Sequence, residues 1–299
     1  MPKDNETLTI NKRTATVWFS VLGLIIAIGL GWFWWHNVYQ DSTRVFWSMM
    51  DNNLSMASVV KHNAVSQQGT STDQYTQMQF GPLSASHGLS NVKQQDNTVS
   101  SETIGTMEND FSRYINIKTN QKTSKGKAVD ASSFMGIWGK TVTAPKGQRA
   151  SVQYFQQSVL GIVAFGNFNG EQRTKLIGFL RSDNTYNLGQ VKNAKFNGRA
   201  VYVYDVDISP QNLIGFLKQY TKELGLGDIG LNPSQYAGSP IVKTQFTVDK
   251  LSHQLIKVHY ISNNQDETYS SMGLEQPIIL PTKTISINDL QNKVVESLK

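Results

Sequence analysis

Residues 191–210 read VKNAKFNGRAVYVYDVDISP, and this stretch contains the pattern on which the fold prediction rests. Asn197-Gly198 separates two strand-like runs, and this dipeptide favours the tight turn of a β-hairpin. Ser209-Pro210 follows, and it supplies an N-cap side chain and a first-turn proline for a helix. The stretch therefore predicts an antiparallel hairpin that leads directly into a helix ending near Gly225.

The same patterns recur on both sides of this stretch. Strand-like segments are predicted at 56–80, 98–119, 241–248, 255–261 and 269–280, helices at 41–54, 152–163, 171–181 and after Ser286, and polar loops at 81–90 and 119–133. The helix after Ser286 begins with a capping box, because Asp289 stands three residues beyond this serine. Long hairpins interrupted by a few helices predict an α+β fold with an antiparallel sheet.

The N-terminal part has a different character. Residues 15–35 carry no formal charge, and at about 1.5 Å per residue a helix over them reaches roughly 31 Å, close to a bilayer's hydrocarbon thickness. This predicts one N-terminal transmembrane helix. The alternative is a cleaved signal peptide, but the apolar run is longer than usual for one and ends in Trp32-Phe33-Trp34-Trp35 instead of small residues.

The charges beside this segment predict its orientation. Lys12 and Arg13 precede it directly, and basic residues resist translocation when they lie close to the ends of a span. We therefore expect a cytoplasmic tail at 1–14, a transmembrane helix at 15–35 and an exported domain at 36–299. The protein would then be a single-pass protein of the cell membrane, with the N-terminus cytoplasmic and the C-terminal domain extracytoplasmic.

Small residues recur every four positions within the same segment. Gly23, Ala27 and Gly31 share one stripe of a helix, and such spacing lets two helices approach closely in lipid. A homodimer through this stripe is one prediction. The other interpretation is that glycine is simply common in membrane helices.

The order of elements from about Asp41 onward resembles the LolA/LppX-like lipoprotein-carrier superfamily. The likeness lies in the run RAVYVYDV at 199–206 before a capped helix, and in FTVDK at 246–250 turning into QLIKV at 254–258. The second half also resembles membrane-anchored exported proteins of bacteria. What the resemblance implies is a curved antiparallel half-barrel packed on a few helices, with a cavity between sheet and helices that suits acyl chains.

Composition and motifs argue against several other classes of function. Cysteine is absent, which excludes disulfides and thiol catalysis, and the net charge of +6 is scattered, so no nucleic-acid partner is expected. The G-x-G-x-x-G pattern at 225–230 follows a helix and not a strand, so we interpret it as a loop. Asp205 and Asp207 share a strand face that we expect to be solvated. We predict no catalytic residue, cofactor or metal site. The histidines have no metal-ligand spacing; they are His36, His62, His87, His253 and His259.

Aromatic side chains on the predicted helices are the candidates for a ligand cavity. They are Phe155, Phe179, Phe216 and Tyr220, although such a stripe can equally belong to the core. The leading hypothesis is a membrane-anchored extracytoplasmic domain that binds an apolar or amphipathic ligand, such as lipid, without catalysis. The alternative is an interaction or sensor module for a protein or a cell-wall polymer.

Overall fold

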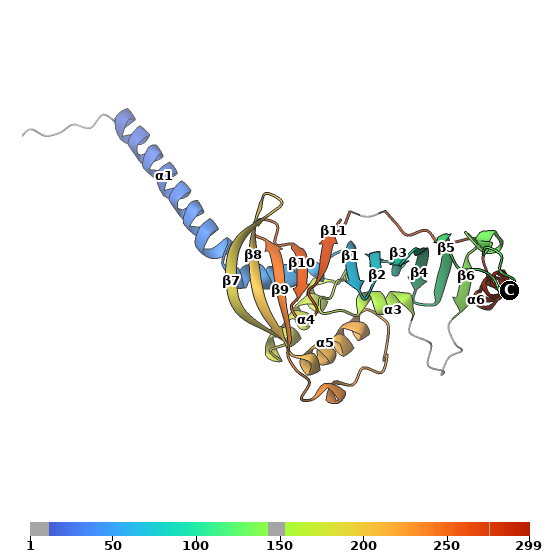
Figure 1. The fold of residues 1–299 in the computed structure, drawn as a ribbon. Helices are drawn as coiled ribbons and strands as arrows, with labels where there is room; N and C mark the ends of the chain where they lie inside the picture. The colour runs from blue at the N-terminus through green and yellow to red at the C-terminus, as the bar shows by residue number, and fades with distance from the viewer. Residues whose placement is uncertain (1–11, 143–152, 275) are drawn as a thin grey trace, which may run out of the picture. The chain divides into compact units, whose positions relative to one another are not determined.

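The computed structural model describes residues 12–142, 153–274 and 276–299, which belong to two units. The first unit, residues 1–45, contains α1 (Lys12–Trp34), the π-helical turn η1 (Trp35–Tyr39) and the first residues of α2 (Ser42–Asn53). The second unit, Phe46–Lys299, contains the rest of α2, the whole β-sheet and the other helices (Figure 1). The helix expected at 41–54 is thus confirmed.

The predicted transmembrane helix at 15–35 needs correction. In the part of the chain that the structure describes, none of the helices is both long and apolar enough to cross a membrane. Gly23, Ala27 and Gly31 are exposed on α1, and the homodimer through them stays a prediction.

The strands of the second unit form one sheet. They are β1 (Ser58–Gln67), β2 (Thr70–Gln79), β3 (Ala85–Gln94), β4 (Asn97–Thr106), β5 (Asn109–Lys118), β6 (Gly139–Val142), β7 (Tyr186–Phe196), β8 (Arg199–Ile208), β9 (Val242–Asp249), β10 (Leu255–Tyr260), β11 (Gln265–Ser270) and β12 (Ile285–Ser286). Their order across the sheet is β12-β6-β5-β4-β3-β2-β1-β11-β10-β9-β8-β7. The sheet is not closed, because β12 and β7 form its two ends.

This sheet corrects the predicted fold class. The prediction was a curved antiparallel half-barrel, whereas the sheet is mixed: β12 pairs with β6 in parallel, and the other neighbouring strands pair antiparallel. A parallel pair requires a long crossover connection, and here it is the whole chain between β6 and β12, which includes β7–β11. Strand-by-strand alternation of side chains does not reveal such a return, since β12 has only two residues.

The remaining helices are short. They are α3 (Tyr154–Val159), α4 (Gly170–Ser182), α5 (Pro210–Glu223), α6 (Ile287–Ser297) and the 3-10 turns η2 (Ala131–Ser133) and η3 (Pro233–Tyr236). Asn169 begins α4 with a capping box, and the side chains of Ser209 and Ser286 accept backbone hydrogen bonds at the starts of α5 and α6. The two serine N-caps are confirmed, but the predicted capping box at Ser286 is not, because the Asp289 carboxylate accepts from the Ser286 hydroxyl.

Both predicted hairpins in the second half are confirmed. In the β7–β8 turn, Asn197 and Gly198 have φ values of 50° and 80°, as a type I′ turn requires. Three predictions were wrong in part. The helix expected at 152–163 is helical only at 154–159. Residues 81–90 contain the start of β3 and are not a loop throughout, and of residues 269–280 only the first two belong to a strand.

Glycine allows α3 to approach the sheet closely. A Cβ on Gly105 would lie 2.5 Å from the backbone nitrogen of Phe155, and one on Gly88 would overlap the Tyr154 hydroxyl. Asp110 fixes the start of the helix, because both of its carboxylate oxygens accept from the Tyr154 N–H at 3.1 and 3.0 Å. Burial raises the pKa of Asp110, and this hydrogen bond lowers it again in part. We call the face that α3 covers the inner face.

The opposite, outer face is crossed by the chain that leads from β11 to β12. Ile278 packs there on Ala85, Ile104 and Phe111, and its N–H donates to the Gln79 side chain at 2.9 Å. We call residues 276–280 the strap. In the strap, Ile278 and Leu280 pack on this cluster and Ile279 is 84% exposed, an alternation that resembles a strand in the sequence.

Aromatic rings form the core between α2 and strands β7–β9. Phe46 lies in ring contact with Tyr186, Tyr204 and Phe246, at centroid separations of 6.1, 5.4 and 6.0 Å. The four side chains are buried. This cluster joins the second unit's part of α2 to the inner face of the sheet.

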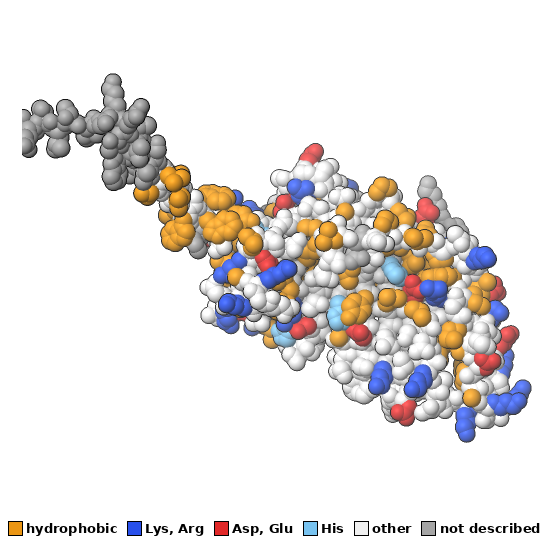
Figure 2. Space-filling model, turned by 90° about the horizontal axis from the view of Figure 1, so that it is seen from above, with side chains coloured by type: hydrophobic (Ala, Val, Ile, Leu, Met, Phe, Trp, Pro, Cys, Tyr) orange, Lys and Arg blue, Asp and Glu red, His pale blue; other side chains and the backbone are white. Residues whose placement is uncertain are grey.

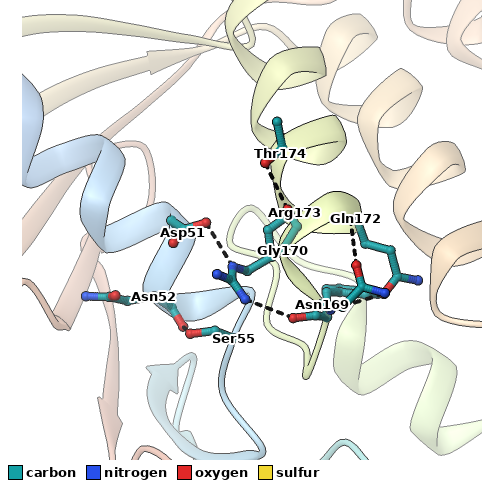
Figure 3. A network of polar contacts seen from close by, with 9 residues as sticks. Asp51, Asn52, Ser55, Asn169, Gly170, Gln172, Arg173 and Thr174 are labelled. Carbon is teal, nitrogen blue, oxygen red and sulfur yellow. Dashed lines mark hydrogen bonds and ion pairs between the residues drawn. The ribbon is translucent and has the colours of Figure 1, made fainter.

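A polar network fixes α4 against the end of α2 (Figure 3). The Arg173 guanidinium donates to Asp51 at 3.0 Å and to the Phe168 carbonyl at 3.1 Å. Asn169 and Gln172 form the reciprocal capping box at the first turn of the helix. These contacts hold α4 against α2 and cap its first turn, so we assign the network a structural role.

Candidate functional site

Three of the four predicted cavity residues lie in the core. Phe155, Phe216 and Tyr220 are each at most 1% exposed, and Phe216 stacks on Tyr220 with ring centroids 6.0 Å apart. The Tyr220 hydroxyl donates to the Phe165 carbonyl at 2.7 Å, and burial raises the pKa of this phenol. These positions therefore fill the interior, which was the second interpretation of the pattern.

Phe179 is the predicted residue that does line a cavity. It is half-buried on α4 and borders a space of about 600 Å³ between α4, α5 and the loop before η3. We call this space the α5 cavity, and its lining is Phe179, Gly215, Lys218, Gln219, Lys222, Gly227, Asp228 and Pro233. Gly227 and Asp228 come from the G-x-G-x-x-G loop, which ends α5 as predicted and then borders this space.

The lining of the α5 cavity contains two lysines and one aspartate, Asp228. Lys218 and Lys222 are exposed, and no carboxylate of the described residues lies within 4.0 Å of either ammonium group. Glu223 on the same helix is already paired: Lys175 donates to it at 2.6 Å and Gln219 at 2.8 Å. The hydrogen bond from Lys175 is the main cause that lowers the pKa of Glu223. The carboxylate therefore stays ionised and engaged at neutral pH.

Alanine substitutions test the space along these helices. Gly178 has open space at its Cβ position, and at Gly215 a Cβ would make ordinary contacts of 3.8 Å with the Phe179 ring. Gly178→Ala and Gly215→Ala are each expected to raise the free energy of unfolding by about 0.5–1 kcal/mol, because alanine restricts the unfolded chain more than glycine. Urea denaturation measures both. A destabilised Gly215→Ala variant would contradict the open α5 cavity.

A second cavity lies between the inner face of the sheet and α6. We call it the α6 cavity; its volume is about 530 Å³, and its lining is Ser101, Thr103, Ser112, Arg113, Tyr114, Ile287, Leu290, Gln291, Val294 and Val295. The helix contributes the aliphatic side chains and the strands β4 and β5 contribute most of the hydroxyl groups. Gly139 on β6 allows α6 to pack this closely, because a Cβ atom at this position would clash with the Leu290 side chain at 2.8 Å. The lining is thus apolar on one side and hydroxyl-rich on the other.

The core beside α2 is solid by comparison. The gap between its side chains has no room for a water molecule, and it is lined by Met50, Leu54, Ala164, Leu180, Tyr186 and Phe216. Close packing of this kind is normal for protein interiors. Of the predicted aromatic residues, Phe179 therefore borders an open space, whereas Phe216 belongs to this solid core.

Histidines of the sheet pair with carboxylates on neighbouring strands. His62 lies 2.6 Å from Asp73, His87 lies 2.7 Å from Glu102, and His259 lies 2.7 Å from Asp266. The face shown in Figure 2 displays histidine side chains next to acidic ones. His259 is a cross-strand neighbour, as predicted, and His253 occupies the β9–β10 turn with φ of 52°.

The predicted strand carboxylates have ordinary surroundings. Asp205 accepts from the Gln245 amide at 2.8 Å, and Asp207 is exposed. Among the residues that the structure describes, no group of three potential metal ligands comes together. The arrangement around Asp205 is thus a cross-strand hydrogen bond.

Sequence reasoning missed most residues of the α6 cavity. The sequence predicted the helix after Ser286 without assigning it a cavity, and the serine and threonine side chains of β4 and β5 gave no signal of their own. Alternation along each strand does place Ser101 with Thr103, and Ser112 with Tyr114, on one face. Which helix covers that face depends on the return of the chain from β11.

Comparison with known proteins does not assign the chain to a family. No protein-family model matches it, and no curated protein matches it significantly. The function is therefore argued from the cavities and their side chains.

Proposed function

We propose that this protein binds an apolar or amphipathic ligand, such as a lipid acyl chain, in the α6 cavity, without catalysing a reaction. The observation that carries the proposal is the position of this cavity. About 530 Å³ lies between a sheet face rich in hydroxyl groups and the aliphatic side of α6. Ligand pockets of proteins usually have about 300–1,000 Å³ of mostly apolar space.

The two sides of the α6 cavity suit the two parts of an amphipathic molecule. Leu290, Val294 and Ile287 offer aliphatic contacts from the helix, whereas Thr103 and Ser112 offer hydroxyl groups from the strands. Burying a methylene group against such a wall contributes about 0.8 kcal/mol. A space between sheet and helix is also where the resemblance to LolA/LppX-like carriers implies a ligand.

We further propose that the protein acts at the outer side of the cell membrane. The apolar side chains of α1 from Leu24 to Trp34 support this location, because eight large ones are 49–64% exposed: Leu24, Ile25, Ile26, Ile28, Leu30, Trp32, Phe33 and Trp34. Fractionation of cells, followed by protease treatment of intact spheroplasts, tests it. Recovery of the full-length chain in the soluble fraction would contradict this part of the proposal.

The binding proposal is tested with the full-length protein and a fluorescent long-chain fatty acid. Val294 is half-buried in the lining, so Val294→Trp places an indole in the cavity. We expect this substitution to weaken binding at least about tenfold, which corresponds to about 1.4 kcal/mol. Organic extracts of the purified protein, measured by mass spectrometry, should contain a stoichiometric lipid that is lost in the variant.

Two further variants make the result interpretable. Asn292→Trp adds the same side chain to an exposed position of α6 outside the lining, and it should leave binding unchanged. Gly215→Trp fills the α5 cavity instead. Loss of binding in Gly215→Trp alone would show that the ligand binds in the α5 cavity, which contradicts the proposal. A clean extract, together with equal affinities of all variants, would overturn the proposal in favour of an interaction or sensor module. Ser112→Leu fills the space from the sheet if Val294→Trp does not fold.

A further inference from the structure

A third and smaller cavity lies under α3, at a different place on the inner face. Its volume is about 230 Å³, and its lining is Lys61, Asn63, Gln74, Thr76, Tyr154, Gln157 and Ser158. We call it the Lys61 pocket. It shares no lining residue with the α6 cavity or the α5 cavity. Every lining side chain is polar, which separates it from the two larger spaces.

The sheet and α3 together build this pocket. Lys61 and Asn63 alternate along β1 and therefore point to the same face, and β2 places Thr76 and Gln74 directly opposite them. The roof comes from Tyr154, whose position is fixed by Asp110 and by the close approach at Gly88 and Gly105. The pocket is thus a preformed part of the second unit.

The hydrogen-bonding groups of the roof and floor are oriented by one another. The Tyr154 hydroxyl lies 3.3 Å from the Thr76 hydroxyl and 3.4 Å from the Gln74 amide nitrogen. The Ser158 hydroxyl donates to the Tyr154 carbonyl at 2.7 Å. These long contacts to the Tyr154 hydroxyl leave the amide and hydroxyl donors able to turn to a bound oxygen atom.

Lys61 is the charged residue of the pocket lining. Lys61 is half-buried, and among the described residues no carboxylate lies within 4.0 Å of its ammonium group. None of the lining residues is acidic. Asn63 uses its amide oxygen to accept from Gln265 at 2.7 Å, so its NH₂ group stays available as a donor. A half-buried cation among neutral donors favours an anion with several oxygen atoms.

The carboxylate on the neighbouring strand is already satisfied. Glu267 pairs in register with Asn63 on β11, and it accepts hydrogen bonds from Tyr260 at 3.2 Å and Tyr269 at 2.7 Å. Burial is the main cause that raises the pKa of both phenols, so both remain protonated donors at neutral pH. This carboxylate therefore has partners other than Lys61.

We propose that the Lys61 pocket binds a phosphate group. Lys61 supplies the charge, and Asn63, Gln74 and Tyr154 supply hydrogen bonds to different oxygen atoms. A space of about 230 Å³ has room for a phosphate group and a few water molecules, at about 30 Å³ for each water. The group can belong to free phosphate or to a phosphorylated head group, because the recognising chemistry is the same. This proposal does not depend on ligand binding in the α6 cavity.

Titration of the full-length protein with inorganic phosphate tests the site, with isothermal calorimetry as the readout. Sodium chloride at matched ionic strength is the blank. We expect saturable one-to-one binding of phosphate, and at least a tenfold loss of affinity in Lys61→Met, which keeps much of the side-chain stem and removes the charge. Glycerol 3-phosphate distinguishes the sources: tighter binding than inorganic phosphate indicates a phosphorylated head group.

Lys93→Met is the matched control. Lys93 is exposed on β3, where it pairs in register with Ser71, and it lies outside the pocket lining. Equal phosphate affinities of Lys61→Met and Lys93→Met would overturn the proposal, as would heats no larger than those of chloride. Gln74→Met, which removes a neutral donor, serves as a second variant if Lys61→Met does not fold, and unchanged binding in it would likewise count against the site.

Discussion

Phe246→Ala is expected to lower the free energy of unfolding by about 3–5 kcal/mol, the usual cost of removing a buried phenylalanine ring. Phe246 is fully buried on β9, where its ring lies 6.0 Å from that of Phe46 and 6.2 Å from that of Tyr186. The surrounding rings come from α2, β7 and β8, so they cannot close the gap without moving separate elements. Chemical denaturation of the full-length protein measures the loss.

Tyr236→Ala is the control for this experiment. Tyr236 is 40% exposed in η3, and substitutions at such positions usually change stability by no more than about 0.5 kcal/mol. A similar small effect of Phe246→Ala would show that the aromatic cluster does not support the second unit. The expected large effect would instead identify this cluster as the part of the core on which β7–β9 depend.

Gly105→Val is expected to destabilise the protein by about 3 kcal/mol, at the upper end of the usual cost of overpacking. The added Cβ would lie 2.5 Å from the Phe155 backbone nitrogen and 2.8 Å from the Tyr154 Cβ. Backbone atoms cannot rotate away as a flexible side chain does, so α3 must move off the sheet. Because Tyr154 roofs the Lys61 pocket, we also expect phosphate binding to weaken in this variant.

Gly178→Ala is the internal comparison for Gly105→Val, since nothing lies near its Cβ position. Thermal denaturation followed by circular dichroism distinguishes the two glycines. If Gly105→Val melts at the wild-type temperature, the close approach of α3 to the sheet is wrong, and with it the roof of the pocket. A lower melting temperature with retained phosphate binding would show that the pocket tolerates a shifted helix.

Local chemistry explains which elements could be predicted from the sequence. Asn197-Gly198 imposes its own turn, and Ser209 and Ser286 satisfy backbone N–H groups within their own helices, so neighbouring residues suffice to place them. The start of β3 was missed for a long-range reason. Gly88 reads as a loop residue, yet it lies within β3, and glycine is required there because the Tyr154 ring occupies the space where a side chain would be.

The candidate sites were less predictable because they join distant parts of the chain. The α6 cavity brings β4 and β5 together with a helix that begins at Ile287, and the Lys61 pocket joins β1 to Tyr154. The aromatic stripe on the helices was visible, but periodicity does not tell a ring in the core from a ring beside a cavity. Phe179 and Phe216 lie on neighbouring helices and differ in this respect.

The unclosed sheet has consequences for encounters between molecules. An unpaired edge strand can pair with a strand of another chain, and proteins prevent this with short edge strands, lysines and bulges. At one border β12 has only two residues, and at the other β7 carries Lys192, Lys195 and a register shift next to Gly189. The first border is therefore very short, and the register shift interrupts the eleven residues of the second. Self-assembly through continued strand addition is therefore disfavoured, and crowding many copies together should leave the sheets separate.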